Sequence, residues 1–307
     1  MKEIRLSEYS YLYSPDREPV ARVSSGERFA AYTEDASTGR YRSIEDLPEY
    51  SKFEGRNPCV GPIFVEGAEK GDTLKVDIIS IEYTRDYAYS RQSAKFGGLQ
   101  ATSQTAMLNE PLEERYYRYD RRGNTFIYND KIYFEGDPFI GSIATAPGRE
   151  SLSTMRPFEN GGNMDVPAVR PGNTLYLPVS VKGAYLYVGD LHARQGDGEI
   201  CGSALEMAGK VTLECEVIKK ERGMNTAWPR LESETSIMAV GCARPLEDAA
   251  RIAGCELISW LTELGWEKYD AYQLISQGME LKIGNIVDPL YTVVAGLPKE
   301  YAYRMKK

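Results

Sequence analysis

The sequence predicts a mainly β protein, built from sandwich- or barrel-like units, that ends in a smaller α+β segment. Runs rich in β-branched and aromatic residues alternate with glycine, asparagine and aspartate turns over residues 1–234. Amphipathic helical spacing is confined to the chain after Pro245. Hydrophobic residues make up 42% of the 307 residues and charged residues 27%, which is typical of a globular chain with a sizeable core.

The first region contains three segments that follow one pattern of strand and turn. Residues 62–82, PIFVEGAEKGDTLKVDIISIE, hold two apolar runs separated by the turn signal Gly71-Asp72. Residues 115–136 are rich in tyrosine and carry asparagine turns, which predicts a hairpin or meander. Residues 169–190 again place a glycine turn before an alternating strand. We therefore expect strands throughout this region.

The pattern of the chain changes after Pro245. Residues 246–265 place leucine, alanine and tryptophan at helical spacing, with acids in the first turn and a glycine at the end. Residues 266–284 predict a second helix, and strands are expected on both sides of the pair. The expected order is β-α-α-β. We divide the chain into a β-rich region that carries the site motifs, residues 1–234, and an α+β segment packed on it, residues 235–307.

Charge and composition exclude several classes of partner. The formal net charge is −8 and no basic cluster offsets it, so we expect no nucleic acid and no anionic membrane surface as a partner. No apolar run approaches the ~20 residues of a membrane span. The first residues carry acids and hydroxyls where a signal peptide is apolar. The five cysteines are odd in number and lack CxxC spacing, which favours a reducing, cytoplasmic location.

One stretch concentrates chemistry: residues 188–202, VGDLHARQGDGEICG. It contains Asp190, Asp197, Glu199 and His192, the only histidine of the chain. Alternation on a strand places Asp190 and His192 on one face, and a returning strand would bring Asp197 and Glu199 opposite them. Imidazole with carboxylates is typical of a divalent metal site or of an acid–base pair. The alternative is a surface or core histidine beside an ordinary turn.

Two further stretches carry polar residues in similar alternation. In RPFENGGNMD the pair Gly161-Gly162 precedes Asn163 and Asp165, and in AAYTEDASTG the sequence places Asp35 two residues after a threonine. Each stretch alone is better explained by a loop, an Asn-Gly loop in the first case and, still more clearly, a solvated acidic turn in the second. In residues 188–202, by contrast, the density of charge on an otherwise apolar β pattern favours a site, because unpaired buried carboxylates are costly.

Together these stretches make the sequence resemble the acetamidase/formamidase family. The resemblance extends from the N-terminus to about Pro298, and GDLHARQGDGE is its most specific motif. The other matching segments are TEDA (33–36), GPIFVEGAEKGDTLKVDI (61–78), PFIGSIATAPG (138–148), GGNMD (161–165), LYLPVSVKGA (175–184), ALEMAG (204–209) and IVDP (286–289). The resemblance implies hydrolysis of short aliphatic amides to acid and ammonia, on a β-rich fold, at a metal-assisted site. Formamide and acetamide are the expected substrates, in preference to bulky aryl amides.

The resemblance also implies residue roles. The family's polar site positions correspond to Asp35, Asn163, Asp165, Asp190, His192 and Glu199. Many members have His-Gly-Gly-Asn where this chain begins the motif with Asn160, so a second imidazole is missing. The chain length fits the shorter, acetamidase-like members better than the longer formamidases.

The expected metal ligands are His192, Asp165 and Asp35. Zinc is the first expectation, and calcium or manganese also fit one imidazole with several oxygens. We expect Glu199 to shuttle protons and Asp190 to orient the imidazole or to bind the metal itself. The oxyanion would be held by Asn163 or by the backbone N–H groups of Gly161 and Gly162.

Three alternatives stay open at this stage. Cys201, close to Glu199, is a candidate nucleophile of a Cys-Glu-Lys amidase, and Ser24-Ser25-Gly26 is a weaker candidate for a Ser-Ser-Lys amidase. The chain could also be a non-catalytic, metal-containing β protein that binds a small molecule. A homodimer is expected, built through the tyrosine-rich strands or the apolar helical faces, although both could equally be core.

Overall fold

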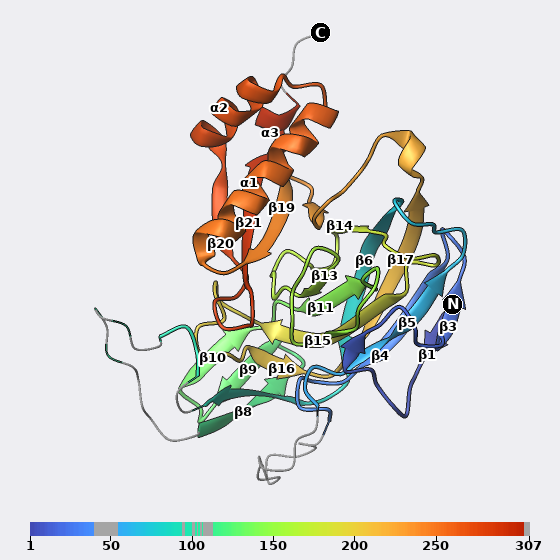
Figure 1. The fold of residues 1–307 in the computed structure, drawn as a ribbon. Helices are drawn as coiled ribbons and strands as arrows, with labels where there is room; N and C mark the ends of the chain where they lie inside the picture. Colours follow the sequence, from blue (N-terminus) through green and yellow to red (C-terminus); the bar gives the residue numbers. More distant parts are fainter. Residues whose placement is uncertain are drawn as a thin grey trace.

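The computed structural model describes residues 1–39, 55–93, 96–99, 102, 104, 106 and 113–303. These residues form two large sheets, and the helices lie over the strands that the C-terminal part of the chain adds to one of them (Figure 1). The expected mainly β fold with a C-terminal α+β segment is confirmed. In the described part of the chain, no helix is long and apolar enough to span a membrane.

The first sheet has nine described strands. In spatial order they are β1 (Lys2–Ile4), β4 (Arg28–Thr33), β17 (Gly209–Ile218), β6 (Thr73–Tyr83), β14 (Thr174–Pro178), β18 (Arg230–Glu232), β19 (Ser236–Ala243), β21 (Tyr291–Pro298) and β20 (Glu280–Ile283). All of its neighbouring pairs are antiparallel except β1 with β4. The turn at Gly71-Asp72 does precede a strand, β6, as the sequence predicts.

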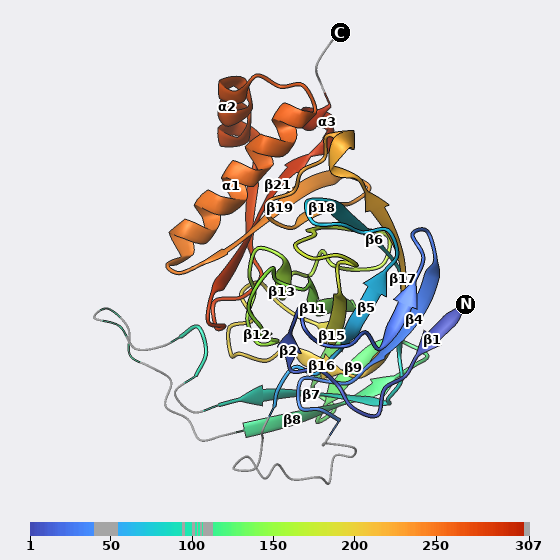
Figure 2. The same cartoon turned by 45° about the vertical axis from the view of Figure 1, so that its right-hand side comes forward.

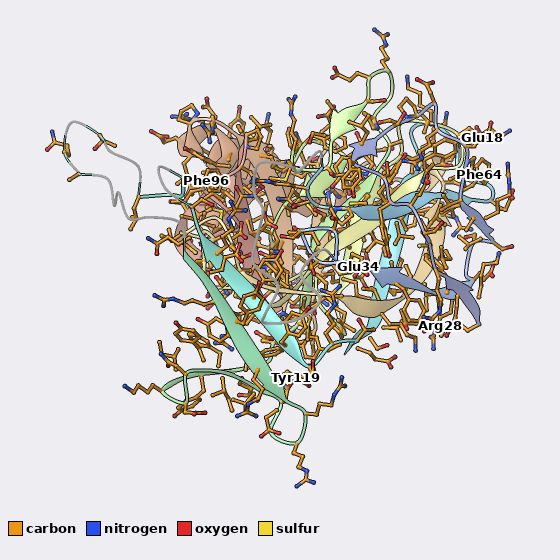
Figure 3. All side chains as sticks on the ribbon, turned by 90° about the horizontal axis from the view of Figure 1, so that it is seen from below. Glu18, Arg28, Glu34, Phe64, Phe96 and Tyr119 are labelled. Atoms are coloured by element: carbon orange, nitrogen blue, oxygen red, sulfur yellow. The ribbon has the colours of Figure 1, made fainter. Side chains whose placement is uncertain are left out.

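The second sheet carries the polar motifs. Its strands are β10 (Ile132–Glu135), β9 (Thr125–Tyr128), β8 (Glu113–Asp120), β7 (Tyr87–Gln92), β16 (Leu205–Met207), β15 (Leu186–Arg194), β11 (Phe139–Thr145) and β13 (Gly161–Asn163). In addition, β5 (Cys59–Val65) pairs with β15, and β3 (Ala21–Val23) pairs with β5. The predicted tyrosine-rich meander is confirmed as β8–β9–β10. Seen from below, Tyr119 lies at the lower middle of the view, where these strands project from the molecule, and Phe64 lies near the right-hand edge (Figure 3). A small third sheet pairs β2 (Leu12–Tyr13) with β12 (Leu152–Ser153).

The main core lies between the two sheets. Leu74 and Val76 of β6 belong to the same apolar cluster as Val188 and Leu191 of β15. Strand β15 is buried at every residue but its last, because it packs on the first sheet and also pairs within its own sheet. Side chains on both faces of β15 are therefore withdrawn from water, including the polar ones.

The helices cover one face of the first sheet (Figures 1 and 2). They are α1 (Leu246–Glu263), α2 (Lys268–Gly278) and the short α3 (Lys299–Ala302), and a 3₁₀ turn spans Lys220–Arg222. Leu257, Trp260 and Leu261 of α1 pack in one cluster with apolar residues of β19 and β21. The α1 helix is confirmed close to its predicted bounds.

The predicted second helix is too long. The observed helix, α2, ends at Gly278, and Met279 is already extended, with φ −75° and ψ 139°. The following residues form β20, which pairs antiparallel with β21. Tertiary pairing overrides the local helical pattern here. The predicted boundary at residue 234 stays a prediction. In the structure, β18 and β19 lie on either side of it and pair with each other within one sheet.

The predicted hairpin after Asp190 is also corrected. The returning strand β16 begins only at Leu205, so Asp197 and Glu199 lie in the connecting loop. Gly198 and Gly202 have φ of 87° and 79°, which turns the loop back and prevents strand geometry. The Gly198 N–H donates to the Ile283 carbonyl (2.8 Å), so the loop is held against the C-terminal segment.

Candidate active site

Five carboxyl side chains and one imidazole meet in the interior of the molecule. They come from the segment after β13, from β15, from the loop that follows it, from β16 and from the β20–β21 connection: Asp165, Asp190, His192, Glu199, Glu206 and Asp288. All six are buried. The structure therefore brings together four residues that the sequence singled out, His192, Asp165, Asp190 and Glu199, and adds two more.

His192 lies at the centre of this cluster. Its Nε2 is 3.4 Å from Asp190 Oδ2 and 3.5 Å from Glu206 Oε2. Ligand atoms of Asp165, Asp190 and His192 lie within 4.8 Å of one another, and so do those of His192, Glu199 and Glu206. Two groups that could hold a metal ion thus share one imidazole.

The backbone at the cluster is unusual. Asp165, Asp190 and Glu199 have φ of 52°, 53° and 47°, a region that non-glycine residues rarely occupy. Such conformations cost free energy and cluster at functional sites, where the surrounding structure enforces them. Glycine at position 141 of β11 is also required, because a Cβ there would lie 2.8 Å from both Asp165 Oδ1 and Asp190 Oδ2.

Burial and mutual repulsion raise the carboxyl pKa values in the metal-free protein. Burial first, and then neighbouring carboxylates, raise the pKa of Asp165 and of Glu199 well above their usual values. The pKa of Glu206 rises to about 7, and so does that of Asp288, again mainly through burial. Burial alone would lower the pKa of His192, but Glu206, Asp190 and Glu199 outweigh it and raise that pKa to about 10.

Asn163 organises two of the carboxylates. Its Nδ2 donates to Asp288 Oδ2 (2.7 Å) and to Asp165 Oδ2 (3.1 Å), while its Oδ1 accepts from Asn57 Nδ2 (2.8 Å) and from the Ser142 hydroxyl. Both amide hydrogens are therefore occupied in this structure. The predicted role of Asn163 as an oxyanion donor stays a prediction, and it would require one of these bonds to open.

Gly161 and Gly162 lie behind the cluster rather than in the lining of its cavity. Their φ values are 106° and 101°, and a Cβ would come within 2.3 Å of the carbonyl oxygens of Ile143 and Arg156, respectively. The Gly161 N–H donates to the Phe158 carbonyl (3.0 Å). What the structure shows for these glycines is close backbone packing, and their predicted oxyanion role stays a prediction.

Asp35 is placed differently from the other predicted ligands. It is fully buried and adjoins the cavity through Ala36 and Ser37, but it belongs to neither group of potential ligand atoms. One carboxylate oxygen accepts from the Ser37 N–H (2.8 Å) and the Gly39 N–H (3.3 Å), and the other pairs with Arg85. Burial raises the pKa of Asp35 although Arg85 opposes this. The carboxylate is thus already fully partnered.

The structure gives no support to a cysteine or serine nucleophile. The Cys201 thiol is directed to the Ser203 carbonyl (3.3 Å), and burial raises its pKa, so it is protonated near neutral pH. Among the described residues that line the cavity there is no lysine. Ser24 and Ser25 lie on the exposed β3–β4 turn, outside that lining.

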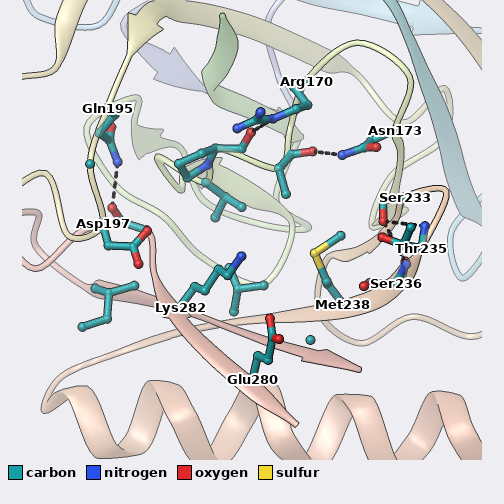
Figure 4. A pocket seen from close by; sticks show the side chains of 18 of the residues that line it. Arg170, Asn173, Gln195, Asp197, Ser233, Thr235, Ser236, Met238, Glu280 and Lys282 are labelled. Atoms are coloured by element: carbon teal, nitrogen blue, oxygen red, sulfur yellow. Dashed lines mark hydrogen bonds between the residues drawn. The ribbon is translucent and has the colours of Figure 1, made fainter. Parts of the chain in front are cut away.

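The cavity at the cluster is small. It measures about 70 Å³ and is lined by Asn57, Tyr89, Asn163, Asp190, Glu199, Glu206 and Asp288, among others. A space of this size suits a few water molecules or a small organic molecule. A separate, larger hollow of about 440 Å³ shares none of these lining residues; it has Gln195 and Asp197 on one side and Glu280 and Lys282 on another (Figure 4).

Several residues of the site were not predicted. Glu206 and Asp288 belong to the cluster, and Asn57, Gln195 and Asn285 hydrogen-bond its members. Glu206 did leave a signal, an acid inside the otherwise apolar strand ALEMAG, which is costly unless it serves a purpose. Asn57 and Asn285 left none, since an isolated asparagine is an ordinary turn residue.

Fold and site together define a class of mainly β proteins that bury one imidazole among several carboxylates beside a small cavity. Within that class, the chain belongs to the acetamidase/formamidase family, whose sequence model matches residues 7–156 and 141–302.

Known relatives agree with this membership. The chain superposes on the acetamidase from Yersinia enterocolitica with a TM-score of 0.88 at 40% identity, covering 96% of this chain and 90% of that one. For the acetamidase from Bacillus halodurans the TM-score is 0.89 at 30% identity, with coverage of 97% and 98%. Over 273 residues it is 28% identical to the acetamidase of Mycolicibacterium smegmatis, covering 70% of this chain and 66% of that protein. The chain thus spans just under two thirds of the length of this curated relative.

Proposed function

We propose that this protein hydrolyses short aliphatic amides to carboxylic acid and ammonia, with a divalent cation bound at the carboxylate cluster. The observation that carries the proposal is a buried site with unpaired oxygens. Asp165 Oδ1, Asp190 Oδ1 and Glu206 Oε2 have no hydrogen-bond partner in the described part of the chain. Family membership and the acetamidases among its relatives support the same activity.

The residues present fit a cation. His192 Nε2 and the unpaired oxygens of Asp165, Asp190 and Glu206 are the donors that would hold it. Gly141 supports this, because a Cβ there would lie 2.8 Å from one of those oxygens, Asp165 Oδ1, and 2.8 Å from Asp190 Oδ2. A nitrogen with several carboxylate oxygens suits zinc first, and calcium or manganese next. When bound, such an ion polarises a carbonyl and makes a water molecule more acidic.

Glu199 is the proposed proton carrier. Hydrolysis adds water across the C–N bond. The water oxygen bonds to the carbonyl carbon, the bond between that carbon and the amide nitrogen breaks, and a proton must reach the leaving nitrogen. Glu199 lines the small cavity, so its carboxylate can accept the water's proton and pass it to the leaving nitrogen. The cavity of about 70 Å³ favours formamide or acetamide over aryl amides.

Two substitutions in the cluster separate these roles. His192→Ala should lose bound Zn²⁺ and recover part of its activity in excess Zn²⁺. Glu199→Gln keeps shape and hydrogen bonding, so Zn²⁺ should remain while kcat falls roughly 10²-fold or more. Cys201→Ala is the matched control and should change neither. Metal content is measured beside ammonia release from formamide and acetamide.

The same measurements decide between the alternatives. A wild-type protein that binds Zn²⁺ tightly but releases no ammonia from either amide is a non-catalytic binding protein. Undiminished release by fully metal-free protein would reject the metal-assisted route. Loss of turnover in Cys201→Ala alone would establish a cysteine nucleophile.

We also propose that the protein forms a homodimer in the cytoplasm. Strand β10 is an edge of its sheet, and all four of its residues are exposed, including Ile132, Tyr133 and Phe134. An exposed apolar edge strand is a ready site for pairing with a second copy. Sedimentation should report a dimer that Tyr133→Lys dissociates. All five cysteines are free, as a reducing compartment requires.

A further inference from the structure

We infer that Gln195 is a positioning residue: its side-chain amide keeps hydrogen on His192 Nδ1 and leaves Nε2 as the nitrogen directed to the carboxylate cluster. Gln195 follows β15 by one residue, and its Oε1 lies 2.9 Å from His192 Nδ1. The sequence contains this glutamine in the GDLHARQGDGE motif, but nothing in its local pattern assigns it a task.

The orientation of the amide follows from its other contacts. Gln195 Nε2 lies 2.9 Å from the carbonyl oxygen of Asp165 and 2.9 Å from that of Gly284. Carbonyl oxygens only accept hydrogen bonds, so the amide nitrogen must face them with its two hydrogens. The amide oxygen must then face the imidazole. Since that oxygen only accepts, Nδ1 is the donor of the pair.

The opposite nitrogen is thereby assigned as well. Nε2 faces Asp190 Oδ2 and Glu206 Oε2 at 3.4 and 3.5 Å. The Phe139 ring packs edge-on against the imidazole, 4.9 Å between centroids, and helps to fix its plane. With Nδ1–H held by Gln195, only Nε2 can offer a lone pair to a cation. Gln195 also links three segments of the site, because Asp165 and Gly284 belong to two separate loops.

Nuclear magnetic resonance can test this directly, because His192 is the only histidine of the chain. Protein labelled with ¹⁵N in histidine and purified without a histidine tag gives one imidazole in a two-bond ¹H–¹⁵N correlation spectrum. In the wild type we expect Nδ1 to be of the protonated type both before and after Zn²⁺ is added. Only Nε2 should change its signal on addition of Zn²⁺.

Two variants of Gln195 and one control sharpen the test. Gln195→Met removes both donor and acceptor at similar length, so the Nδ1 signal should shift and Zn²⁺ affinity should fall roughly 10- to 100-fold. Gln195→Glu keeps an acceptor for Nδ1–H, so that proton should persist although the two carbonyls lose their donors. Asp197→Asn, in the same loop and lining the same hollow, should leave both imidazole signals unchanged.

The outcome does not depend on turnover, although the importance of Gln195 for catalysis rests on the proposed function. A Zn²⁺-loaded wild type in which Nδ1 binds the ion or lacks its proton would overturn the inference, and this result needs no variant to fold. Identical spectra and Zn²⁺ affinity for wild type and Gln195→Met would overturn it too. Protonated Nδ1 in a protein that releases no ammonia would uphold it and reject only the amidase proposal.

Discussion

Two groups of buried charge in this protein are built in opposite ways. At the boundary between β18 and α1, Arg230 is fully buried and donates to Glu256 Oε1 (2.7 Å) and to both oxygens of Glu263 (2.5 and 3.0 Å). Its guanidinium also lies over the Trp260 ring, 5.3 Å from the centroid. In the candidate site, by contrast, five carboxyl groups surround a single imidazole, and three of their oxygens have no partner in the described residues.

The difference separates a structural role from a functional one. Burying charge is tolerable when every polar atom is paired, and the Arg230 group meets this condition with three hydrogen bonds. The candidate site does not meet it, and burial there raises the pKa of four of its carboxyl groups, those of Asp165, Glu199, Glu206 and Asp288. An arrangement that is unfavourable when empty becomes favourable when a cation enters, which is why unpaired oxygens indicate function more strongly than charge itself.

The largest effect on stability is expected where pairing is complete. Arg230→Met leaves Glu256 buried without its guanidinium and should lower the free energy of unfolding by about 3–5 kcal/mol. Amide turnover per folded molecule should stay at the wild-type level. Urea unfolding and ammonia release measure the two. Glu263→Gln, at a partly exposed partner, is the control with a smaller loss, and an equal loss of turnover in both variants would contradict the separation of roles.

The second prediction concerns pH and the metal-free site. Glu206 and Asp288 have pKa values of about 7 in the folded protein, above the roughly 4 of unfolded carboxyl groups. Between these pH values the folded state binds more protons than the unfolded state does. The free energy of unfolding therefore falls as the pH rises from about 4 to 7. Glu206 alone would contribute on the order of 3 kcal/mol.

Thermal unfolding with a chelator should therefore show Tm falling from pH 5 to pH 8. The stabilisation by added Zn²⁺ should grow over the same range, because a cation binds the deprotonated carboxylates. Glu206→Gln removes one titrating group and should flatten the metal-free curve. A metal-free wild type whose Tm rises more steeply with pH than that of Glu206→Gln would refute this account.

The smallest effect is expected at Asp35, whose oxygens are all partnered. Asp35→Asn weakens its pairing with Arg85 and should cost about 1–3 kcal/mol of stability. Zn²⁺ content should not change, because Asp35 lies outside both groups of potential ligand atoms. Metal analysis of the folded variant, beside Asp165→Asn as a matched carboxylate, decides this. Loss of Zn²⁺ in Asp35→Asn would show instead that Asp35 is a metal ligand.

Much of the local structure was determined by the sequence itself. Glycine turns and apolar alternation predicted the strands on both sides of Gly71-Asp72, and helical spacing predicted α1, because these patterns reflect the geometry of one segment at a time. The pairing of Asp190 with His192 was predictable for the same reason. Side chains two residues apart on a strand share a face, and the structure places their atoms 3.4 Å apart.

Only the tertiary structure decided the composition of the site. Asp288 reaches Asn163 from 125 residues further along the chain, and Asp35 meets Arg85 rather than the cluster because of where β4 lies in the other sheet. Gln195 acquires its orientation only from carbonyl groups of two distant loops. Such contacts depend on strand order and loop packing across the whole fold, which no local pattern of residues records. Whether a buried carboxylate is paired is likewise a property of the assembled interior.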